Sequence, residues 1–285
     1  MRWEHGRRSD NIEDRRGLRV SGKGLAGGGI GIIAIALIAM FLGVDPAIVL
    51  NQAGNLATTQ TEQTQPNFSP EEERLKEFMS VVLADTEDVW GNLFQRSGQQ
   101  YQQPKLVLFS GAVQSACGFA EAAMGPFYCP ADQKLYLDMS FFNDLAQRHD
   151  APGDFAQAYV VAHEVGHHVQ TLLGISEQVH AARQSASAVE GNALQVRMEL
   201  QADCFAGVWA HHAHKARQIL EPGDTEEALA AAAGVGDDRL QKQARGYVVP
   251  DSFTHGSSQQ RMRWFDRGLQ TGDPGQCDTF KARTL

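Results

Sequence analysis

The sequence of 285 residues is short of positive charge. It contains 25 Lys and Arg residues against 34 Asp and Glu residues, and seven of the 25 lie within residues 1–23. Residues 24–285 therefore hold 18 basic and 30 acidic residues, for a net charge of −12. A surface this acidic is a poor match for nucleic acid. We therefore expect no nucleic-acid partner.

Cysteine is also scarce. The four cysteines are Cys117, Cys129, Cys204 and Cys277, and no two of them form a CxxC pair, which argues against a zinc site made of thiolates. An even number of cysteines is typical of disulfides formed in an oxidising compartment. Of the three possible pairings we favour a local bridge between Cys117 and Cys129, which flank a segment containing glycine and proline. That choice leaves Cys204 to pair with Cys277.

A long uncharged hydrophobic run occurs once, at residues 25–43. Nineteen residues just span the hydrocarbon core of a bilayer as a helix. Because the residues before the run are basic, the positive-inside rule places them in the cytoplasm. The sequence thus predicts a cytoplasmic head at residues 1–23, a single transmembrane anchor at 24–43, a linker at 44–68 and a domain at 69–285. This domain would face the periplasm or the extracellular space, and the anchor would lie in the cell membrane.

Two other interpretations of the run are a cleaved signal peptide and a buried helix of a globular domain. No clear small-x-small cleavage site follows the run and the head is long, which favours an uncleaved anchor. Three consecutive glycines would weaken a helix in water. Gly27 and Gly31 form a GxxxG pair, through which two anchors could associate into a homo-oligomer.

Hydrophobic spacing predicts a mainly α-helical α+β domain. Ser69 and Glu72 have the spacing of a capping box, with Pro70 at the first helical position. The predicted helices cover residues 69–98, 141–148, 154–174, 176–214 with a break near Gly191, 225–233 and 258–268. Two strands are predicted, at 104–110 and 134–138, with a Gly-rich loop between them.

The helix predicted at 154–174 carries the motif His163-Glu164-x-x-His167. The two imidazoles lie one turn apart on one helix face and can supply half of a tetrahedral Zn²⁺ site. Glu164 points about 100° round the helix, so it is poorly placed as a ligand. It is well placed to take a proton from a water that the metal activates. The neighbouring residues are largely apolar, and a buried apolar helix has no structural use for these three polar groups unless something pairs with them.

A second pair of polar residues lies on the helix predicted at 176–214. Glu199 and Asp203 are four residues apart on one face, among apolar neighbours. Two carboxylates stacked in this way repel each other, and a cation beside them removes the problem. We assign Glu199 as the third zinc ligand. Asp203 is assigned as the acceptor for the far N–H of a zinc-bound histidine.

A site in which a metal-activated water attacks a carbonyl group also needs a donor that stabilises the tetrahedral oxyanion. His255 precedes the last predicted helix in a loop of Ser, Thr and Gly, and it is our first candidate, with Tyr247 the second. A loop histidine that bonds only to its own turn is the alternative. The other histidines near helix ends are interpreted as solvated residues: His168, His180, His211, His212 and His214.

Together these residues resemble the gluzincin arrangement of zinc metallopeptidases. More narrowly, the chain resembles the bacterial membrane-anchored neutral zinc metallopeptidase family over nearly its whole length. The strings that carry the resemblance include Gly125-Pro126-Phe127-Tyr128-Cys129-Pro130, Glu199-Leu200-Gln201-Ala202-Asp203-Cys204 and Phe253-Thr254-His255-Gly256-Ser257. The resemblance implies a zincin-like fold, one zinc ion held by His163, His167 and Glu199, and Glu164 as general base.

The sequence therefore predicts a membrane-anchored zinc metallopeptidase that acts on a peptide or protein substrate. An edge strand at residues 135–138 would pair with an extended substrate. One alternative is a zinc-stabilised envelope module that binds other proteins without cutting them, but such a module has no use for Glu164. The other alternative is a soluble cytosolic protein with a chance motif.

Overall fold

The computed structural model of the protein describes residues 1–18 and 68–285. The predicted anchor at 24–43 and nearly all of the predicted linker at 44–68 lie outside these described residues. None of the helices in the two described ranges combines the length and the hydropathy that a membrane span requires.

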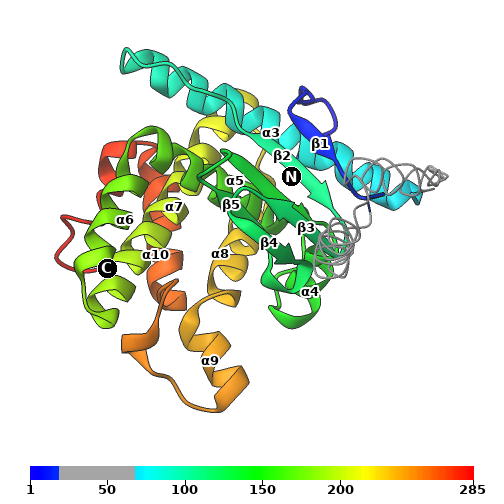
Figure 1. Ribbon diagram of the computed structural model, residues 1–285. Coiled ribbons are helices and arrows are strands. Elements are labelled where there is room, and N and C mark those ends of the chain that lie inside the picture. The colour runs from blue at the N-terminus through cyan, green and yellow to red at the C-terminus, as the bar shows by residue number, and fades with distance from the viewer. Residues whose placement is uncertain (19–67) are drawn as a thin grey trace, which may run out of the picture. The chain divides into compact units, whose positions relative to one another are not determined.

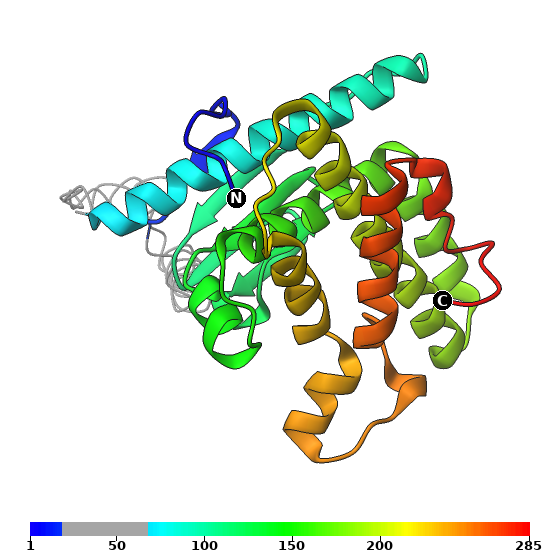
Figure 2. The same ribbon diagram turned by 180° about the vertical axis from the view of Figure 1, so that it is seen from behind.

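The described chain is mainly α-helical with a small mixed sheet, which confirms the predicted α+β class (Figure 1). The helices are α3 (Pro70–Arg96), α4 (Phe141–Arg148), α5 (Asp154–Leu172), α6 (Ile175–Ser185), α7 (Ala188–Arg217), α8 (Asp224–Gly234), α9 (Asp237–Arg245) and α10 (Ser258–Thr271). The strands are β1 (Ile12–Asp14), β2 (Lys105–Phe109), β3 (Ala112–Ser115), β4 (Gly118–Glu121), β5 (Phe127–Cys129) and β6 (Lys134–Asp138). Short 3₁₀ turns occur at Ala122–Met124, Pro250–Ser252 and Pro274–Cys277. Both views show α3 as one long helix beside the sheet, and α7 packed between α5 and α10 (Figure 1, Figure 2).

Local capping explains where the long helices begin. Ser69 and Glu72 form the predicted capping box at the start of α3. The helix predicted at 176–214 is instead two helices, α6 and α7, and the break lies at residues 186–187 rather than near Gly191. Ser187 caps α7 in a second capping box with Glu190, so the chain starts a new helix there and Gly191 lies inside it.

The larger sheet has the strand order β1-β2-β6-β5. Strands β1, β2 and β6 are parallel, whereas β5 runs antiparallel to β6, with Tyr128 opposite Leu135. The prediction that residues 135–138 form an edge strand is therefore wrong. Strand β5 forms that edge, because the turn at residues 130–133 folds residues 127–129 back against β6. The predicted Gly-rich loop also contains the β3–β4 hairpin.

The division predicted at residue 69 does not hold for the first residues of the chain. Residues 1–15 belong to the same compact unit as residues 68–285, and β1 is a strand of the larger sheet. A three-residue strand has little structure of its own, and β1 is formed by its pairing with β2. Residues 1–15 are thus part of the domain and not a separate head.

Two disulfides, one local and one between distant parts of the chain, have the pairing that we favoured. Cys117–Cys129 links the turn of the β3–β4 hairpin to the edge strand β5. Cys204–Cys277 links α7 to the C-terminal 3₁₀ turn. No free cysteine remains in the described residues.

Glu87 on α3 provides a test of how firmly residues 1–15 are bound. Its side chain is 1% exposed and accepts hydrogen bonds from Ser9 Oγ at 2.5 Å, Asn11 Nδ2 at 2.8 Å and Arg7 at 2.7 Å. Because Glu87→Ala removes the buried acceptor that these three donors share, we expect it to lower the free energy of unfolding by about 3 kcal/mol. Chemical denaturation measures this loss. Gln95→Ala, an exposed position on the same helix, is the control and should change stability by less than about 0.5 kcal/mol. Equal stability of the two variants would mean that residues 1–15 contribute little.

Candidate metal centre

The candidate metal centre lies where α5 crosses α7. Gly166, inside the His163–His167 motif, permits this close contact. A Cβ atom at position 166 would lie 2.9 Å from the carbonyl oxygen of Ala202 and 3.2 Å from its Cβ. Because Gly166 has no side chain and Ala202 has only a methyl group, α5 and α7 approach closely enough for Glu199 to reach the two histidines.

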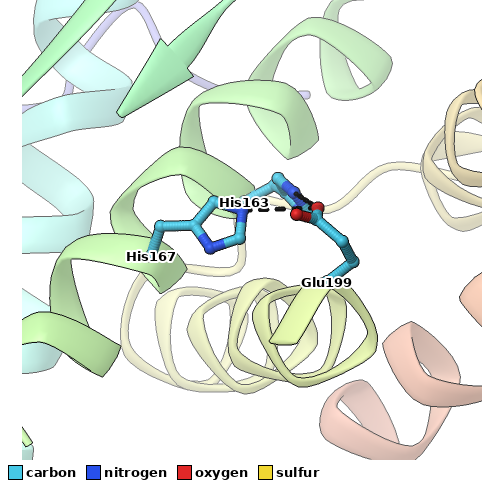
Figure 3. Close-up of side chains that lie close together, drawn as sticks. All are labelled: His163, His167 and Glu199. Atoms are coloured by element: carbon cyan, nitrogen blue, oxygen red, sulfur yellow. Dashed lines mark hydrogen bonds and ion pairs between the residues drawn. The ribbon is translucent and has the colours of Figure 1, made fainter. Parts of the chain in front are cut away.

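Three potential ligand atoms meet at this crossing (Figure 3). Glu199 Oε2 lies 3.2 Å from His163 Nε2 and 3.4 Å from His167 Nε2. Two ligands of a tetrahedral zinc ion at ~2.0–2.1 Å are separated by about 3.3 Å, so the observed spacing fits one shared ion. His163 and Glu199 are buried and His167 is partly buried, which restricts access to the centre from solvent.

The other ring nitrogen of each histidine is already engaged. His163 Nδ1 lies 2.8 Å from Asp203 Oδ1, and His167 Nδ1 lies 2.8 Å from Gln170 Oε1. Since Gln170 donates its amide to the carbonyl of Met198, its oxygen is oriented toward His167 as an acceptor. With Nδ1 donating in both rings, each Nε2 has the free lone pair that a metal needs. The expected contact between Asp203 and a histidine of the motif is therefore present, and that histidine is His163.

Asp203 is fully buried and has three partners. Its oxygens accept from Tyr159 Oη at 2.5 Å and from Arg261 Nε and Nη2 at 2.8 Å each, in addition to His163. Burial alone would raise the pKa of Asp203, but Arg261 and His163 outweigh it and hold the pKa well below its usual range. Asp203 therefore stays ionised, and it fixes the ring of His163.

Sequence reasoning missed Tyr159, Gln170 and Arg261. Tyr159 and Gln170 had a local signal, because they lie four residues before His163 and three residues after His167 on the same helix. Arg261 comes from α10, about 100 residues away from the motif, and had no local signal in the sequence. Only the packing of α10 against α7 brings its guanidinium to Asp203.

Glu199 is held from its other side. Its Oε1 accepts from Gln195 Nε2 at 2.8 Å, one helical turn earlier. Burial raises the pKa of Glu199, but the electrostatic effect of His167 and His163 is larger and holds it well below the usual range. The third potential ligand is thus an oriented carboxylate.

A cleft of about 820 Å³ opens onto the centre. Glu164, His167, Glu199 and His255 line it together, and Met124, Phe127, Val179 and Met198 contribute an apolar wall. Glu164 is half-buried at this surface, next to the ligands but not among the three grouped atoms. The predicted general base and two of the three potential metal ligands, His167 and Glu199, therefore face the same cleft.

His255 is oriented by Asp237, the first residue of α9. Asp237 Oδ2 accepts from the backbone N–H groups of Thr254 at 2.7 Å, His255 at 2.6 Å and Gly256 at 3.0 Å, and Oδ1 lies 3.4 Å from His255 Nδ1. Burial raises the pKa of Asp237, and the hydrogen bonds from His255 lower it by more. Tyr247, the second predicted candidate, is 60% exposed and is not among the described residues that line the cleft.

One histidine lies elsewhere than predicted. His168 was interpreted as solvated, but it is fully buried. Its Nε2 lies 2.6 Å from the carbonyl oxygen of Gln102, and its Nδ1 lies 3.1 Å from the hydroxyl of Tyr128 on β5. His168 thus connects the motif helix to the edge strand of the sheet, since it points away from the ligand face.

Comparison with known proteins gives consistent matches. The family model described as "Putative neutral zinc metallopeptidase" matches residues 1–280. The chain is 51% identical to "Uncharacterized protein YpfJ" of Escherichia coli K12, over 98% of this chain and 99% of that protein. It is 44% identical to "Uncharacterized protein Rv2575" of Mycobacterium tuberculosis, over 87% and 86% of the two chains. No solved structure matches the chain.

Proposed function

Because the chain belongs to the neutral zinc metallopeptidase family, we propose that it is a zinc-dependent peptidase that hydrolyses peptide bonds in the cleft beside Glu164. The observation that carries the proposal is the grouping of His163, His167 and Glu199 at the spacing of one tetrahedral ion, on the wall of a cleft that also contains Glu164. The same geometry favours a zincin-like arrangement of the site.

The roles of the residues follow from their positions. His163, His167 and Glu199 would hold one Zn²⁺, which polarises a carbonyl and lowers the pKa of a water. Glu164 accepts the proton of the attacking water and passes it to the leaving amine. His255 donates to the developing oxyanion, and Asp237 holds the His255 loop in place.

The substrate is an extended peptide segment. Strand β5 is the sheet edge nearest α5, and its residues Phe127 and Tyr128 line the cleft. The free backbone groups of an edge strand can pair with an added strand. We therefore move the proposed pairing from residues 135–138, which form the interior strand β6, to β5.

The two disulfides support a location outside the reducing cytoplasm. We propose that the peptidase unit faces the periplasm or the extracellular space. The transmembrane anchor at residues 24–43 and association through Gly27 and Gly31 stay predictions from the sequence.

A direct test measures metal and products together. Full-length protein is purified in detergent, its zinc content is determined by mass spectrometry, and a mixed peptide library is incubated with the protein. We expect about one zinc per chain and new peptide termini that disappear after treatment with a chelator and return when zinc is added. If the zinc-loaded protein yielded no new termini, the proposed peptidase activity would be wrong. The alternative of a zinc-stabilised binding module would then be favoured.

Zinc binding is expected to depend on pH. Burial lowers the pKa of His163, but Asp203 and Glu199 more than offset it and raise that pKa to about 9. Below that pH the metal-free protein carries a proton on His163 that zinc must displace. The zinc association constant should therefore rise about tenfold per pH unit for each displaced proton, over roughly pH 6 to pH 8. Competition with a zinc indicator measures this slope, and a slope of zero would contradict the assignment of His163 as a ligand.

Variants of the His255 loop test its role in turnover. We expect His255→Ala to lower kcat by about 10²-fold and Asp237→Asn by about tenfold, with smaller changes in KM, because both weaken stabilisation of the transition state. Asp238→Asn is the control, since Asp238 bonds Ser258 at the start of α10 and not the His255 loop. If the His255→Ala variant kept the wild-type kcat, the proposed role of His255 in stabilising the oxyanion would be wrong.

A further inference from the structure

The first residues of the chain complete the sheet of the peptidase unit. Strand β1 pairs with β2 in parallel, with Ile12 opposite Leu106 and Asp14 opposite Leu108. The backbone N–H of Leu106 donates to the carbonyl of Asn11 at 2.9 Å, and that of Arg15 donates to the carbonyl of Leu108 at 2.7 Å. Lys134 of β6 also reaches Glu13 at 2.8 Å. Residues 11–15 are therefore bonded to the domain through their backbone.

A group of acidic residues at the start of α5 and α8 depends on the same segment. Asp154, Asp224 and Glu227 lie close enough together to suggest a cation site. The α-ammonium group of Met1 already lies 2.6 Å from Asp154 and 3.5 Å from Asp224. Since Asp224 is buried, it would be a costly unpaired charge without that cation. The group is thus explained by residues 1–15 and not by a metal.

Apolar packing gives an independent sign of the same attachment. Trp3 is 8% exposed, and its ring lies 5.2 Å from that of Phe78 on α3. The guanidinium of Arg74 lies over the other part of the ring at 5.6 Å. Without residues 1–15, the ring of Phe78 on α3 would lose its contact with Trp3.

Three of the seven basic residues that suggested a cytoplasmic head contribute to this contact. Arg7 binds Glu87 and Asp88, Arg8 binds Glu77, and Arg2 binds Glu221, all acids of the domain. Such exposed ion pairs add little stability. They do show that the basic segment and the acidic surface of the domain are complementary in charge. The charge asymmetry between residues 1–23 and the rest of the chain therefore has an explanation other than retention in the cytoplasm.

Strand pairing sets a limit on membrane topology. Paired strands lie about 4.8 Å apart, whereas the hydrocarbon core of a bilayer is about 30 Å thick. A bilayer therefore cannot separate β1 from β2. We propose that residues 1–15 and 68–285 lie on the same side of the membrane, and that residues 16–67 are an insertion within the peptidase unit whose two ends emerge on that side. This replaces the topology predicted from the sequence, in which residues 24–43 cross the membrane once with residues 1–23 inside and the domain outside, and it does not depend on peptidase activity.

Single cysteines in the full-length chain test the proposal. The four native cysteines are all in disulfides, so a new thiol can be labelled selectively. One cysteine replaces Asp10, within residues 1–15, and the other replaces Gln99, which follows α3. Both positions are exposed. Spheroplasts are treated with a membrane-impermeant maleimide before or after permeabilisation, and a cytoplasmic thiol protein serves as the marker of membrane integrity.

We expect the two positions to be labelled under the same condition, either both before permeabilisation or both only after it. Both before would place the unit outside the cytoplasm, and both after would place it inside; either result supports one shared side. Labelling of one position before permeabilisation and of the other only after it would overturn the proposal. Thermal melting of each variant, compared with the unmodified chain, ensures that the accessible thiols belong to folded protein.

Discussion

Replacing Glu164 by glutamine should lower kcat for peptide hydrolysis by about 10³-fold, the effect typical of removing a general base. Glutamine has nearly the same shape, and Glu164 is not one of the three grouped ligand atoms, so zinc content and stability should stay unchanged. Steady-state kinetics on a peptide found in the library screen, with zinc analysis of both proteins, measures the two quantities together.

A matched control for this variant is Glu177→Gln. Glu177 lies on α6 and lines the same cleft, but it is outside the ligand group. Its replacement should change kcat by less than about tenfold, since it removes a charge from the cleft without removing the base. If Glu164→Gln kept the activity of Glu177→Gln, the proposed role of Glu164 would be wrong even with zinc bound. Loss of zinc in Glu164→Gln would instead make Glu164 a ligand.

Removing Arg261 should have the largest effect on stability. Its guanidinium is buried and donates to both oxygens of Asp203 and to the hydroxyl of Tyr159. Arg261→Met removes the guanidinium that bonds both oxygens of Asp203, in a place where water cannot replace it, and leaves the ring of His163 as the remaining charged partner. We expect a loss of about 3–5 kcal/mol in the free energy of unfolding. Chemical denaturation of the zinc-free protein measures the loss without a contribution from the metal.

The same substitution should also weaken zinc binding. Asp203 orients His163, and disturbing a group of this kind lowers metal affinity by about 10- to 100-fold. Arg263→Met, at an exposed position on the same helix, is the matched control and should cost less than about 1 kcal/mol. In the double variant Arg261→Met with Asp203→Leu, both charges are gone, and the total loss should be smaller than the sum of the two single losses. Additive losses would show that the two side chains are not coupled.

Short-range features of the fold were predictable because they are set by neighbours in the chain. The capping box at Ser69, the strands at 104–110 and 134–138, and the helix that carries His163 and His167 all follow from local patterns. The capping box of Ser187 with Glu190 has the same spacing as that of Ser69 with Glu72, and it places the start of α7 before Gly191. Its spacing alone would have divided the predicted helix at 176–214 correctly.

Long-range features were not predictable in the same way. Strand β1 has three residues and no pattern of its own, so only its register with β2 shows that it is a strand. In the strand order, β5 lies at the edge and β6 lies inside the sheet. This order depends on a four-residue turn and on which strands pair, and the alternation of hydrophobic residues predicts neither. The charge of residues 1–23 was a real signal, but it was attributed to the membrane when it also matches the acidic surface of the domain.

By itself, the sequence determined the chemistry available to this protein: two imidazoles one helical turn apart, a carboxylate beside them, and a second carboxylate pair on a later helix. These arrangements follow from helical periodicity, which places residues four apart in the sequence on the same helix face. Tertiary structure decided how they are used. The close crossing at Gly166 and Ala202 brings Glu199 to the histidines, α10 brings Arg261 to Asp203, and pairing with β2 brings residues 1–15 into the domain. Such contacts form only when surfaces distant in sequence pack together, so no local pattern encodes them.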